Sequence, residues 1–199
     1  MNEIQEVAKV INRGGVIAFR TDTFYGLGAD PFNREALRTI QQLKGREGDK
    51  PILIVISELD QIERLITDRT RSFGILAERL WPGPLTLIGK AASAVPEEIT
   101  AATGTVGVRL PGDDKVRALI RECGGALTAT SANPSHQPPA KTGPEVHQYF
   151  GEKLDLIVDG GTAQTDRPST VVDVTGTEPR LIREGVIPWV EIRTAFVRA

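Results

Sequence analysis

The chain has 199 residues, of which 40% are hydrophobic, and this suffices to build one domain spanning residues 1–199. Its 24 Lys and Arg residues against 26 Asp and Glu residues give a net charge of -2, which argues against a surface built throughout for a polyanion. Cys123 is the one cysteine, so the sequence excludes an internal disulfide framework and a cysteine-based zinc cage.

The first 15 residues predict a helix and a turn rather than a leader. Ile4, Val7 and Ile11 recur at helical spacing, and two glycines at 14–15 end the helix before the apolar strand 16–19. Acidic residues interrupt the segment where a signal peptide needs a continuous apolar core. No later segment approaches the roughly 20 apolar residues of a membrane span. We therefore expect a cytoplasmic protein that does not enter a membrane.

The next segment predicts helix, strand and helix in turn. Asn33 caps a helix that is expected to end near Lys44. The run 51–56 is rich in β-branched residues, which is typical of a buried strand. Ser57, with Asp60 three residues later, matches a capping box and predicts that another helix begins there.

The alternation of strand and helix continues to the end of the chain. Strands are expected at 85–88, 106–110, 126–129, 156–158, 170–174 and 181–183, and helices at 70–80, 114–122, 143–150 and 187–196. Two loop-rich stretches, 91–104 and 134–143, interrupt the pattern. Apolar strands between one-sided helices favour an α/β sandwich, and the close spacing of the later strands favours a sheet that is partly antiparallel.

Several familiar motifs are missing. The sequence holds no G-x-x-x-x-G-K-[ST] phosphate loop, and the segment 26–31 fails the dinucleotide pattern because it ends in proline. His136 and His147 do not form an H-E-x-x-H zinc motif, and no serine stands in a G-x-S-x-G elbow. The sequence therefore predicts no protein-bound metal and no serine-hydrolase chemistry.

Four polar clusters lie where strands or helices are expected to end, which is where α/β proteins place binding sites. They are Thr21 to Gly28, Lys44-Gly45-Arg46 with Lys50, Thr105 to Pro111, and Thr128 to Pro134. The second cluster follows a helix C-terminus, so it could bind phosphate only through the charge of its own side chains. Taken alone, each cluster could also be a turn, a cap or a helix-end charge pair, and spacing leaves the function open.

In this order, however, the clusters resemble the YrdC family of threonylcarbamoyl-adenylate synthases. The resemblance extends from about Ile11 to Ile187. Its motifs are the K-x-R at 44–46, the S-x-N at 131–133, the T-[DE]-T-x-Y-G-L-G at 21–28, the W-P-G-P-[LV]-T at 81–86, the T-V-x-V-R-x-P at 105–111 and the S-T-[VI]-[VI]-D at 169–173. Glu47 and Glu184 depart from the family, which often has proline there, and we expect the chain, which ends at Ala199, to be a short member without the extra C-terminal domain of longer ones.

The resemblance implies a fold and a reaction. The fold is a twisted mixed sheet with helices packed on it, a YrdC-like α/β sandwich with an open concave cleft. The reaction condenses L-threonine, bicarbonate and ATP to threonylcarbamoyl-AMP and pyrophosphate, with Mg²⁺ bridging phosphate oxygens. The product would pass to a threonylcarbamoyl transferase that acts on tRNA.

The resemblance also implies site residues, carried over position by position. Lys44 and Arg46 would be catalytic and would be exposed in the empty cleft. The ATP-binding set would be Lys44, Arg46, Lys50, Thr105, Ser131, Asn133, Pro139 and Arg183. The threonine-binding set would be Thr23, Arg109, Ala129 and Ser169.

Two alternative functions stay open from the sequence. The first is an RNA-binding module without catalysis, because the family presents a concave basic surface, although the net charge and 5% aromatic content weigh against it. Weak RNA binding could also accompany the synthase activity. The second alternative is a carbamoyltransferase domain that uses carbamoyl phosphate, like the related domain of hydrogenase maturation proteins.

Overall fold

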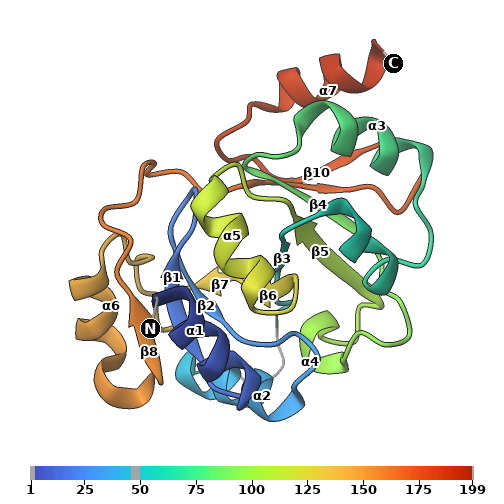
Figure 1. The fold of residues 1–199 in the computed structure, drawn as a ribbon. Coiled ribbons are helices and arrows are strands. Elements are labelled where there is room, and N and C mark those ends of the chain that lie inside the picture. The colour runs from blue at the N-terminus through green and yellow to red at the C-terminus, as the bar shows by residue number, and fades with distance from the viewer. Residues whose placement is uncertain (1–2, 46–49, 199) are drawn as a thin grey trace.

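The computed structural model describes residues 3–45 and 50–198, and Figure 1 shows its course. Helices and strands alternate along most of the chain. The elements are α1 (Glu3–Asn12), β1 (Ile17–Arg20), β2 (Tyr25–Gly28), α2 (Arg34–Leu43), β3 (Ile54–Ile56), η1 (Leu59–Arg64), α3 (Arg71–Leu80), β4 (Leu85–Lys90), α4 (Glu97–Thr100), β5 (Thr105–Arg109), α5 (Asp114–Glu122), β6 (Ala126–Thr128), β7 (Thr130–Ser131), α6 (Gly143–Phe150), η2 (Gly151–Lys153), β8 (Leu156–Val158), β9 (Thr170–Asp173), β10 (Arg180–Arg183) and α7 (Trp189–Val197).

The strands form two mixed sheets. A four-stranded sheet has the order β7-β2-β1-β8, and a six-stranded sheet has the order β10-β9-β4-β5-β3-β6. In the first, β1 pairs antiparallel with β2 and parallel with β8. In the second, β4 pairs antiparallel with β5 and parallel with β9, and β10 closes one edge antiparallel to β9. The expected mixed α/β fold is confirmed, with two sheets in place of one.

The division into two sheets depends on strands that the sequence did not predict. β2 contains two glycines, which have low strand propensity, and β7 is only two residues long. Gly28 is needed in β2 because a Cβ there would lie 2.7 Å from the Phe19 ring on the paired strand. Tertiary packing therefore sets these strands.

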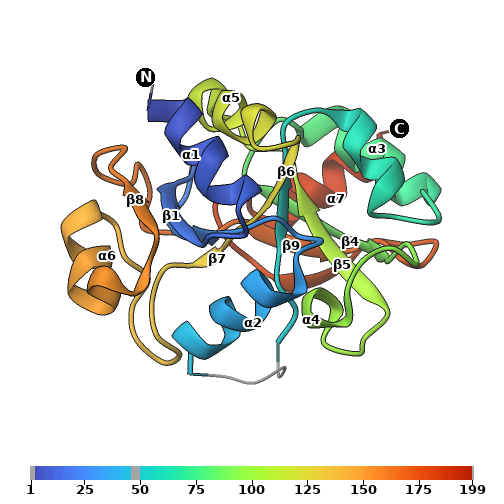
Figure 2. The ribbon, with the colours of Figure 1, turned by 60° about the horizontal axis from the view of Figure 1, so that its bottom comes forward.

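Helices cover both faces of the sheets. Figure 2 shows α1 and α5 on one side and α2 and α4 on the other. Apolar residues of α1 and α5, including Val7, Ile11, Val116 and Ile120, form one buried cluster together with strand residues such as Phe19. A larger cluster lies among the strands of both sheets and the helices α2, α3 and α6. Burial of this apolar area is the main force that holds the layers together.

Side-chain caps start several helices where the sequence predicted them. Asn33 Oδ1 accepts from the backbone N–H groups of Glu35 and Ala36, both at 3.1 Å, and so begins α2. Asp113 caps α5 and Thr142 caps α6 in the same way. These contacts satisfy backbone donors that have no partner within the helix.

The predicted capping box at Ser57 is wrong. Ser57 is buried, and its hydroxyl donates to the backbone oxygen of Gly125 at 3.4 Å, so it is turned away from the helix that follows. That helix is a short 3-10 segment, η1, whose cap position Glu58 makes no side-chain capping bond. The stretch 91–104, expected as a loop, also contains the short helix α4. Within residues 3–45 and 50–198, none of the helices has the length and apolar character that crossing a membrane requires.

Candidate active site

A cavity of about 440 Å³ lies where the two sheets meet. It is lined by the turn between β1 and β2, by β4, β5, β9 and β10, and by the chain that enters β3 and leaves β6. Eight of the twelve sequence-predicted site residues line it: Thr23, Lys50, Thr105, Arg109, Ala129, Ser131, Ser169 and Arg183. The fold therefore brings together side chains that are up to 160 positions apart in the sequence.

Arg109, at the end of β5, is the most buried cation of the cavity, with 2% of its surface exposed. Its Nη1 donates to Thr23 Oγ1 at 3.2 Å, and its Nη2 lies 3.0 Å from Asp22 Oδ1. Nε is buried and has no hydrogen-bond partner among residues 3–45 and 50–198. Burial lowers the pKa of Arg109, and the Asp22 carboxylate opposes that lowering. A buried N–H without a partner is costly, so this guanidinium is suited to receive an anionic ligand.

The turn between β1 and β2 is built from its own hydroxyl groups. Thr21 Oγ1 donates to the backbone oxygen of Phe24 at 2.7 Å and accepts from the backbone N–H of Thr23 at 3.1 Å. The hydroxyls of Thr21 and Thr23 are also 3.1 Å apart. The second carboxylate oxygen of Asp22, Oδ2, accepts a hydrogen bond from the backbone N–H of Gly112 at 3.2 Å, which fixes this side chain. The turn thus presents Thr23 and Asp22 to Arg109 in a fixed geometry.

A second group of polar side chains comes from β4, β9 and β10, which follow β5 in the same six-stranded sheet. Thr86 Oγ1 and Ser169 Oγ are 2.9 Å apart, and Nη2 of Arg183 donates to the backbone oxygen of Ser169 at 3.0 Å. The chain that leaves β10 passes close to the start of β9 at Gly185. A Cβ at that position would lie 2.1 Å from the backbone oxygen of Pro168, so only glycine fits there.

Positive charge is concentrated at this end of the cavity. Desolvation of its guanidinium lowers the pKa of Arg183, and the nearby charge of Arg109 lowers it further. Lys50 lines the same cavity, and Asp22 is already engaged by Arg109. An anion bound between the two guanidinium groups would relieve their repulsion, so the site is electrostatically prepared for a carboxylate or phosphate.

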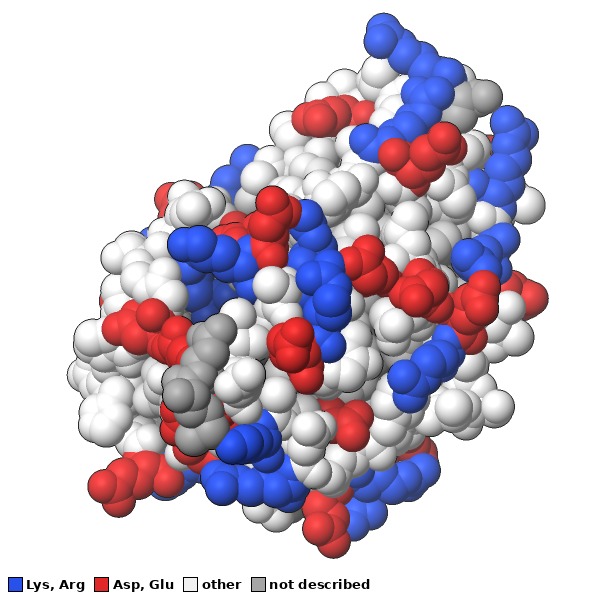
Figure 3. Space-filling view, viewed as in Figure 1, with Lys and Arg blue, Asp and Glu red and all other residues white. Residues whose placement is uncertain are grey.

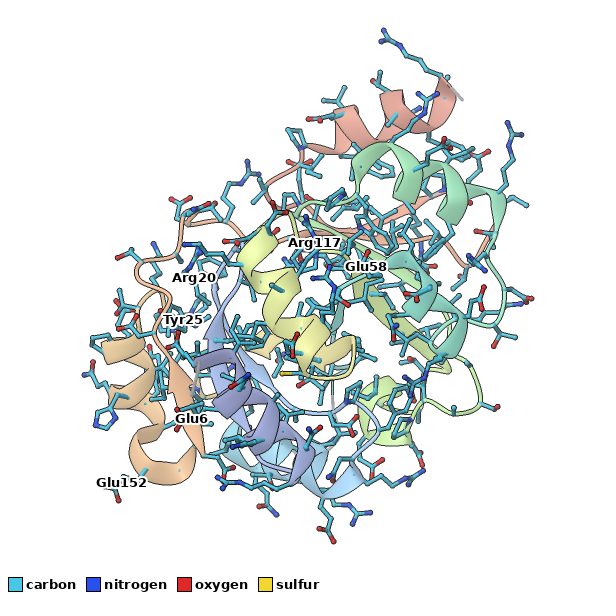
Figure 4. The ribbon with its side chains drawn as sticks, in the orientation of Figure 1. Glu6, Arg20, Tyr25, Glu58, Arg117 and Glu152 are labelled. Atoms are coloured by element: carbon cyan, nitrogen blue, oxygen red, sulfur yellow. The ribbon has the colours of Figure 1, made fainter. Side chains whose placement is uncertain are left out.

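The β1–β2 hairpin also fixes the segment that leads toward Ser169. Arg20 and Tyr25 face each other across the hairpin, and Figure 4 labels both. The Tyr25 hydroxyl lies 2.9 Å from Asp159 Oδ1 and 2.7 Å from the backbone oxygen of Gly161, and it accepts from the backbone N–H of Gly160 at 3.0 Å. Burial, followed by the hydrogen bond to Asp159, raises the pKa of Tyr25 to about 12.

The K-x-R motif is placed differently from the expectation. Lys44 follows α2 and is only 3% exposed, so the expectation that it is exposed in the cleft is wrong. Its ammonium donates to the backbone oxygens of Ser131 and Asn133. The sequence favoured exposure because lysines near helix ends are usually solvated, whereas here a loop from 87 residues away covers the side chain. Arg46, the other predicted catalytic residue, lies outside the described residues.

Two other predicted nucleotide-binding residues lie outside the described lining of the cavity. Asn133 is buried, and its Nδ2 donates to the backbone oxygens of Pro134 at 2.9 Å and Gln137 at 2.6 Å, so it shapes the turn that follows β7. Pro139 is half-buried further along the same loop. Sequence reasoning did not single out Asp22 or Thr86 as site residues, although both lie inside quoted motifs.

A family model described as Telomere recombination (Sua5_yciO_yrdC) matches residues 9–185. Because it matches most of the chain, the chain belongs to the Sua5/YciO/YrdC family. A threonylcarbamoyl-AMP synthase of Thiobacillus denitrificans is 38% identical over 164 residues, which are 82% of this chain and 87% of that protein. A threonylcarbamoyl-AMP synthase of Pyrococcus abyssi is 37% identical over 96% of this chain, but the chain spans only 56% of that protein.

Solved structures agree with this assignment. The crystal structure of P. abyssi Sua5 complexed with L-threonine has a TM-score of 0.93 at 37% identity, over 96% of this chain and 56% of that chain. Escherichia coli YciO, at 24% identity, has a TM-score of 0.83 and shares the fold. The arrangement of two mixed sheets around the cavity is therefore that of the family.

Proposed function

We propose that this chain is a threonylcarbamoyl-AMP synthase, an enzyme that joins L-threonine, bicarbonate and ATP and releases pyrophosphate. The observation that carries the proposal is the buried Arg109, whose Nε has no partner and whose neighbour Arg183 adds a second positive charge. The names of the relatives and the threonine bound by the P. abyssi protein support the same assignment. We propose that the product is passed to a transferase that modifies tRNA.

The threonine carboxylate would bind the guanidinium of Arg109. A planar guanidinium can donate two parallel hydrogen bonds to a carboxylate, and Nε here is a buried donor without a partner in the described part of the chain. Thr23 and Ser169 present hydroxyls on facing walls, which can orient the amino acid. Ala129 lines the cavity as well and would contact the substrate through its apolar side chain.

The chemistry needs no covalent intermediate on the enzyme. The threonine nitrogen forms a bond to the carbon of bicarbonate, water leaves, and the resulting carbamate carries a negative charge. A carbamate oxygen then forms a bond to the α-phosphorus of ATP, and the bond to pyrophosphate breaks. Two anions must approach each other in these steps, so positioning and positive charge supply most of the catalysis.

The residues around the cavity fit that requirement. Lys50 and Arg183 are the cations able to contact phosphate oxygens, and the hydroxyls of Thr105 and Ser131 can donate hydrogen bonds to the nucleotide. The proposal keeps Arg46 as a further phosphate contact, carried over from the family motif. Asn133 and Pro139 would shape the loop against which the nucleotide lies.

The proposal also includes Mg²⁺, which would be held by phosphate oxygens. Among residues 3–45 and 50–198, no group of three or more His, Cys, Asp or Glu side chains is arranged to hold a metal ion. The cations and hydroxyls of the cavity would hold the phosphates of ATP, and the phosphate oxygens would hold the ion. When bound, the ion neutralises phosphate charge and so favours attack by an anion.

The two alternatives predict other behaviour. The face in Figure 3 carries positive and negative side chains interspersed, whereas an RNA-binding module is expected to present a continuous basic patch. A carbamoyltransferase would accept carbamoyl phosphate, which the proposed synthase does not use.

The decisive experiment measures pyrophosphate release and the incorporation of isotope-labelled bicarbonate. The proposal expects an acid-labile labelled adenylate only when ATP, Mg²⁺ and L-threonine are all present. Label incorporation without threonine, or activity with carbamoyl phosphate, would contradict it.

A further inference from the structure

Lys44 contacts the segment 131–135 and is not among the residues that line the cavity. Its ammonium donates to the backbone oxygen of Ser131 and, at 2.8 Å, to that of Asn133. Nζ also lies 3.4 Å from Ser131 Oγ and 3.4 Å from Asn133 Oδ1. The backbone oxygen of Lys44 accepts from the backbone N–H of Ser135 at 3.0 Å. The end of α2 thus holds this segment through both its backbone and its side chain.

Burial of the ammonium is compensated by these contacts. Lys44 is 3% exposed, and backbone oxygens together with the negative end of the α2 dipole stabilise its charge. Two of the three N–H donors of the ammonium are used on the backbone oxygens of Ser131 and Asn133. A phosphate oxygen that displaced either of them would break a charge-assisted contact with the segment 131–135, which is unfavourable in a buried site.

The held segment needs an anchor of this kind. β7 is two residues long and pairs with β2 at two positions, Gly26 with Ser131 and Leu27 with Thr130. Such a short strand pair has few hydrogen bonds to fix the chain at Ser131, which lines the cavity. The contacts from Lys44, at the end of α2, hold the segment in addition to its pairing with β2.

We propose that Lys44 is a positioning residue, which fixes the Ser131 hydroxyl at the cavity wall and does not itself contact phosphate. This inference rests on the proposed function for the role of Ser131 as a donor to the nucleotide. Lys50 provides the contrast, because it is exposed and lines the cavity, so that its charge can reach the phosphates directly.

The test compares Lys44→Met with the matched variant Lys50→Met. Both delete one positive charge, but only Lys44→Met removes donors from the segment 131–135. In hydrogen exchange without substrates, Lys44→Met should speed exchange in that segment at least about tenfold, since charge-assisted contacts that close it are lost. Lys50→Met should leave the exchange of the segment unchanged.

Salt dependence of the KM for ATP separates the two roles. Lys50→Met should flatten the dependence, because a screened contact between lysine and phosphate is lost. Lys44→Met should raise the KM for ATP roughly tenfold, as expected for misplacing one donor, while keeping the wild-type salt dependence. A flattened salt dependence together with unchanged exchange in Lys44→Met would mean direct phosphate binding and would overturn the proposal.

Coupling to Ser131 supplies a second criterion. If Lys44 acts through that hydroxyl, the KM for ATP of the double variant Ser131→Ala with Lys44→Met should be no higher than that of Lys44→Met alone. If instead each substitution raises the KM for ATP by its own factor and the factors multiply in the double variant, the proposal is overturned. Should Lys44→Met fail to fold, Lys44→Gln takes its place. Its neutral amide can still donate, so the increases in exchange and in the KM for ATP should be smaller but in the same direction.

The exchange measurement also separates this inference from the proposed function. It needs neither turnover nor a substrate. Fast exchange in Lys44→Met, alongside a wild-type protein that shows no threonine-dependent pyrophosphate release, would remove the synthase assignment and keep the anchoring role. Normal synthase activity of the wild type, together with unchanged exchange in Lys44→Met, would keep the synthase assignment and remove the anchoring role.

Discussion

The buried Arg109 forms an ion pair with the partly buried Asp22, with 3.0 Å between Oδ1 and Nη2. Asp22 is the carboxylate that compensates Arg109, whose other nearby charge is the cation Arg183. Asp22 also accepts from the backbone N–H of Gly112, so the pair ties the β1–β2 turn to the end of β5. It therefore has consequences for stability as well as for substrate binding.

Removing the carboxylate should destabilise the fold. Asp22→Ala is expected to lower the free energy of unfolding by about 3 kcal/mol, because breaking a buried pair leaves an uncompensated buried charge. Asp22→Asn should cost less, since its amide oxygen can still accept from Arg109. Urea unfolding of the two variants and the wild type measures the difference. Equal stability of all three proteins would show that Asp22 is not the partner that stabilises Arg109.

Arg109→Lys tests the threonine subsite. Lysine keeps the charge but cannot donate two parallel hydrogen bonds to a carboxylate. We expect the KM for threonine to rise roughly tenfold or more while the KM for ATP changes little, because the lost contact is made to the amino acid. Steady-state kinetics with each substrate varied in turn checks this. A change confined to ATP would place the threonine carboxylate elsewhere.

The sequence predicted most elements because their signals are local. Asn33 and Asp113 cap helices whose apolar residues recur at helical spacing, and these helices form where expected. β2 and β7 were missed because their positions depend on pairing between distant segments, for which Gly26 and Ser131 carry no propensity signal. The second sheet was missed with them.

The candidate site was predicted through motif resemblance more than through local chemistry. Arg109 and Ser169 line the cavity as expected, but no spacing rule shows that β4 would lie between their strands in one sheet. The burial of Lys44 could not be predicted, because it depends on a loop that follows β7. Asp22 was overlooked because an acidic residue in a turn is usually solvated.

The raised pKa of Tyr25 gives a spectroscopic prediction. The chain has two tyrosines, so subtracting the titration of Tyr25→Phe from that of the wild type isolates Tyr25. Its phenol should ionise near pH 12, because burial and the hydrogen bond to Asp159 disfavour the phenolate. As the folded-state pKa lies above the ordinary value near 10, the stability from this group is complete below pH 10 and is lost toward pH 12. Absorbance near 295 nm that saturates by about pH 10.5 would contradict the buried hydrogen-bonded state.

Cys123 reports on unfolding of the α1 and α5 side of the molecule. The thiol is buried at the end of α5, and burial, followed by the charge of Glu122, raises its pKa to about 12. The thiolate is the reactive form, so at pH 8 a thiol reagent should react with native protein at least about a hundredfold more slowly than with a small free thiol. Because this is the one cysteine, labelling follows one site. Rapid labelling of native protein without loss of structure would mean that this side opens readily.

Thr86, whose hydroxyl lies 2.9 Å from that of Ser169, should influence threonine binding without contacting ATP. Thr86→Val keeps the shape of the side chain but deletes the hydroxyl, so the Ser169 hydroxyl loses its shorter contact and keeps the one to Arg183 Nη2 at 3.4 Å. We expect the KM for threonine to rise about threefold to tenfold, the usual cost of one neutral hydrogen bond, with the KM for ATP nearly unchanged.

Thr86→Ser is the matched control, because it keeps the hydroxyl and removes only a methyl group. It should retain most of the threonine affinity if orientation of Ser169 is what matters. The methyl group of Thr86 also faces Gly107, where an added Cβ would lie 3.2 Å away, so packing offers a competing explanation. If Thr86→Ser impairs threonine binding as much as Thr86→Val does, packing of the methyl group sets the geometry, and the hydroxyl pair does not.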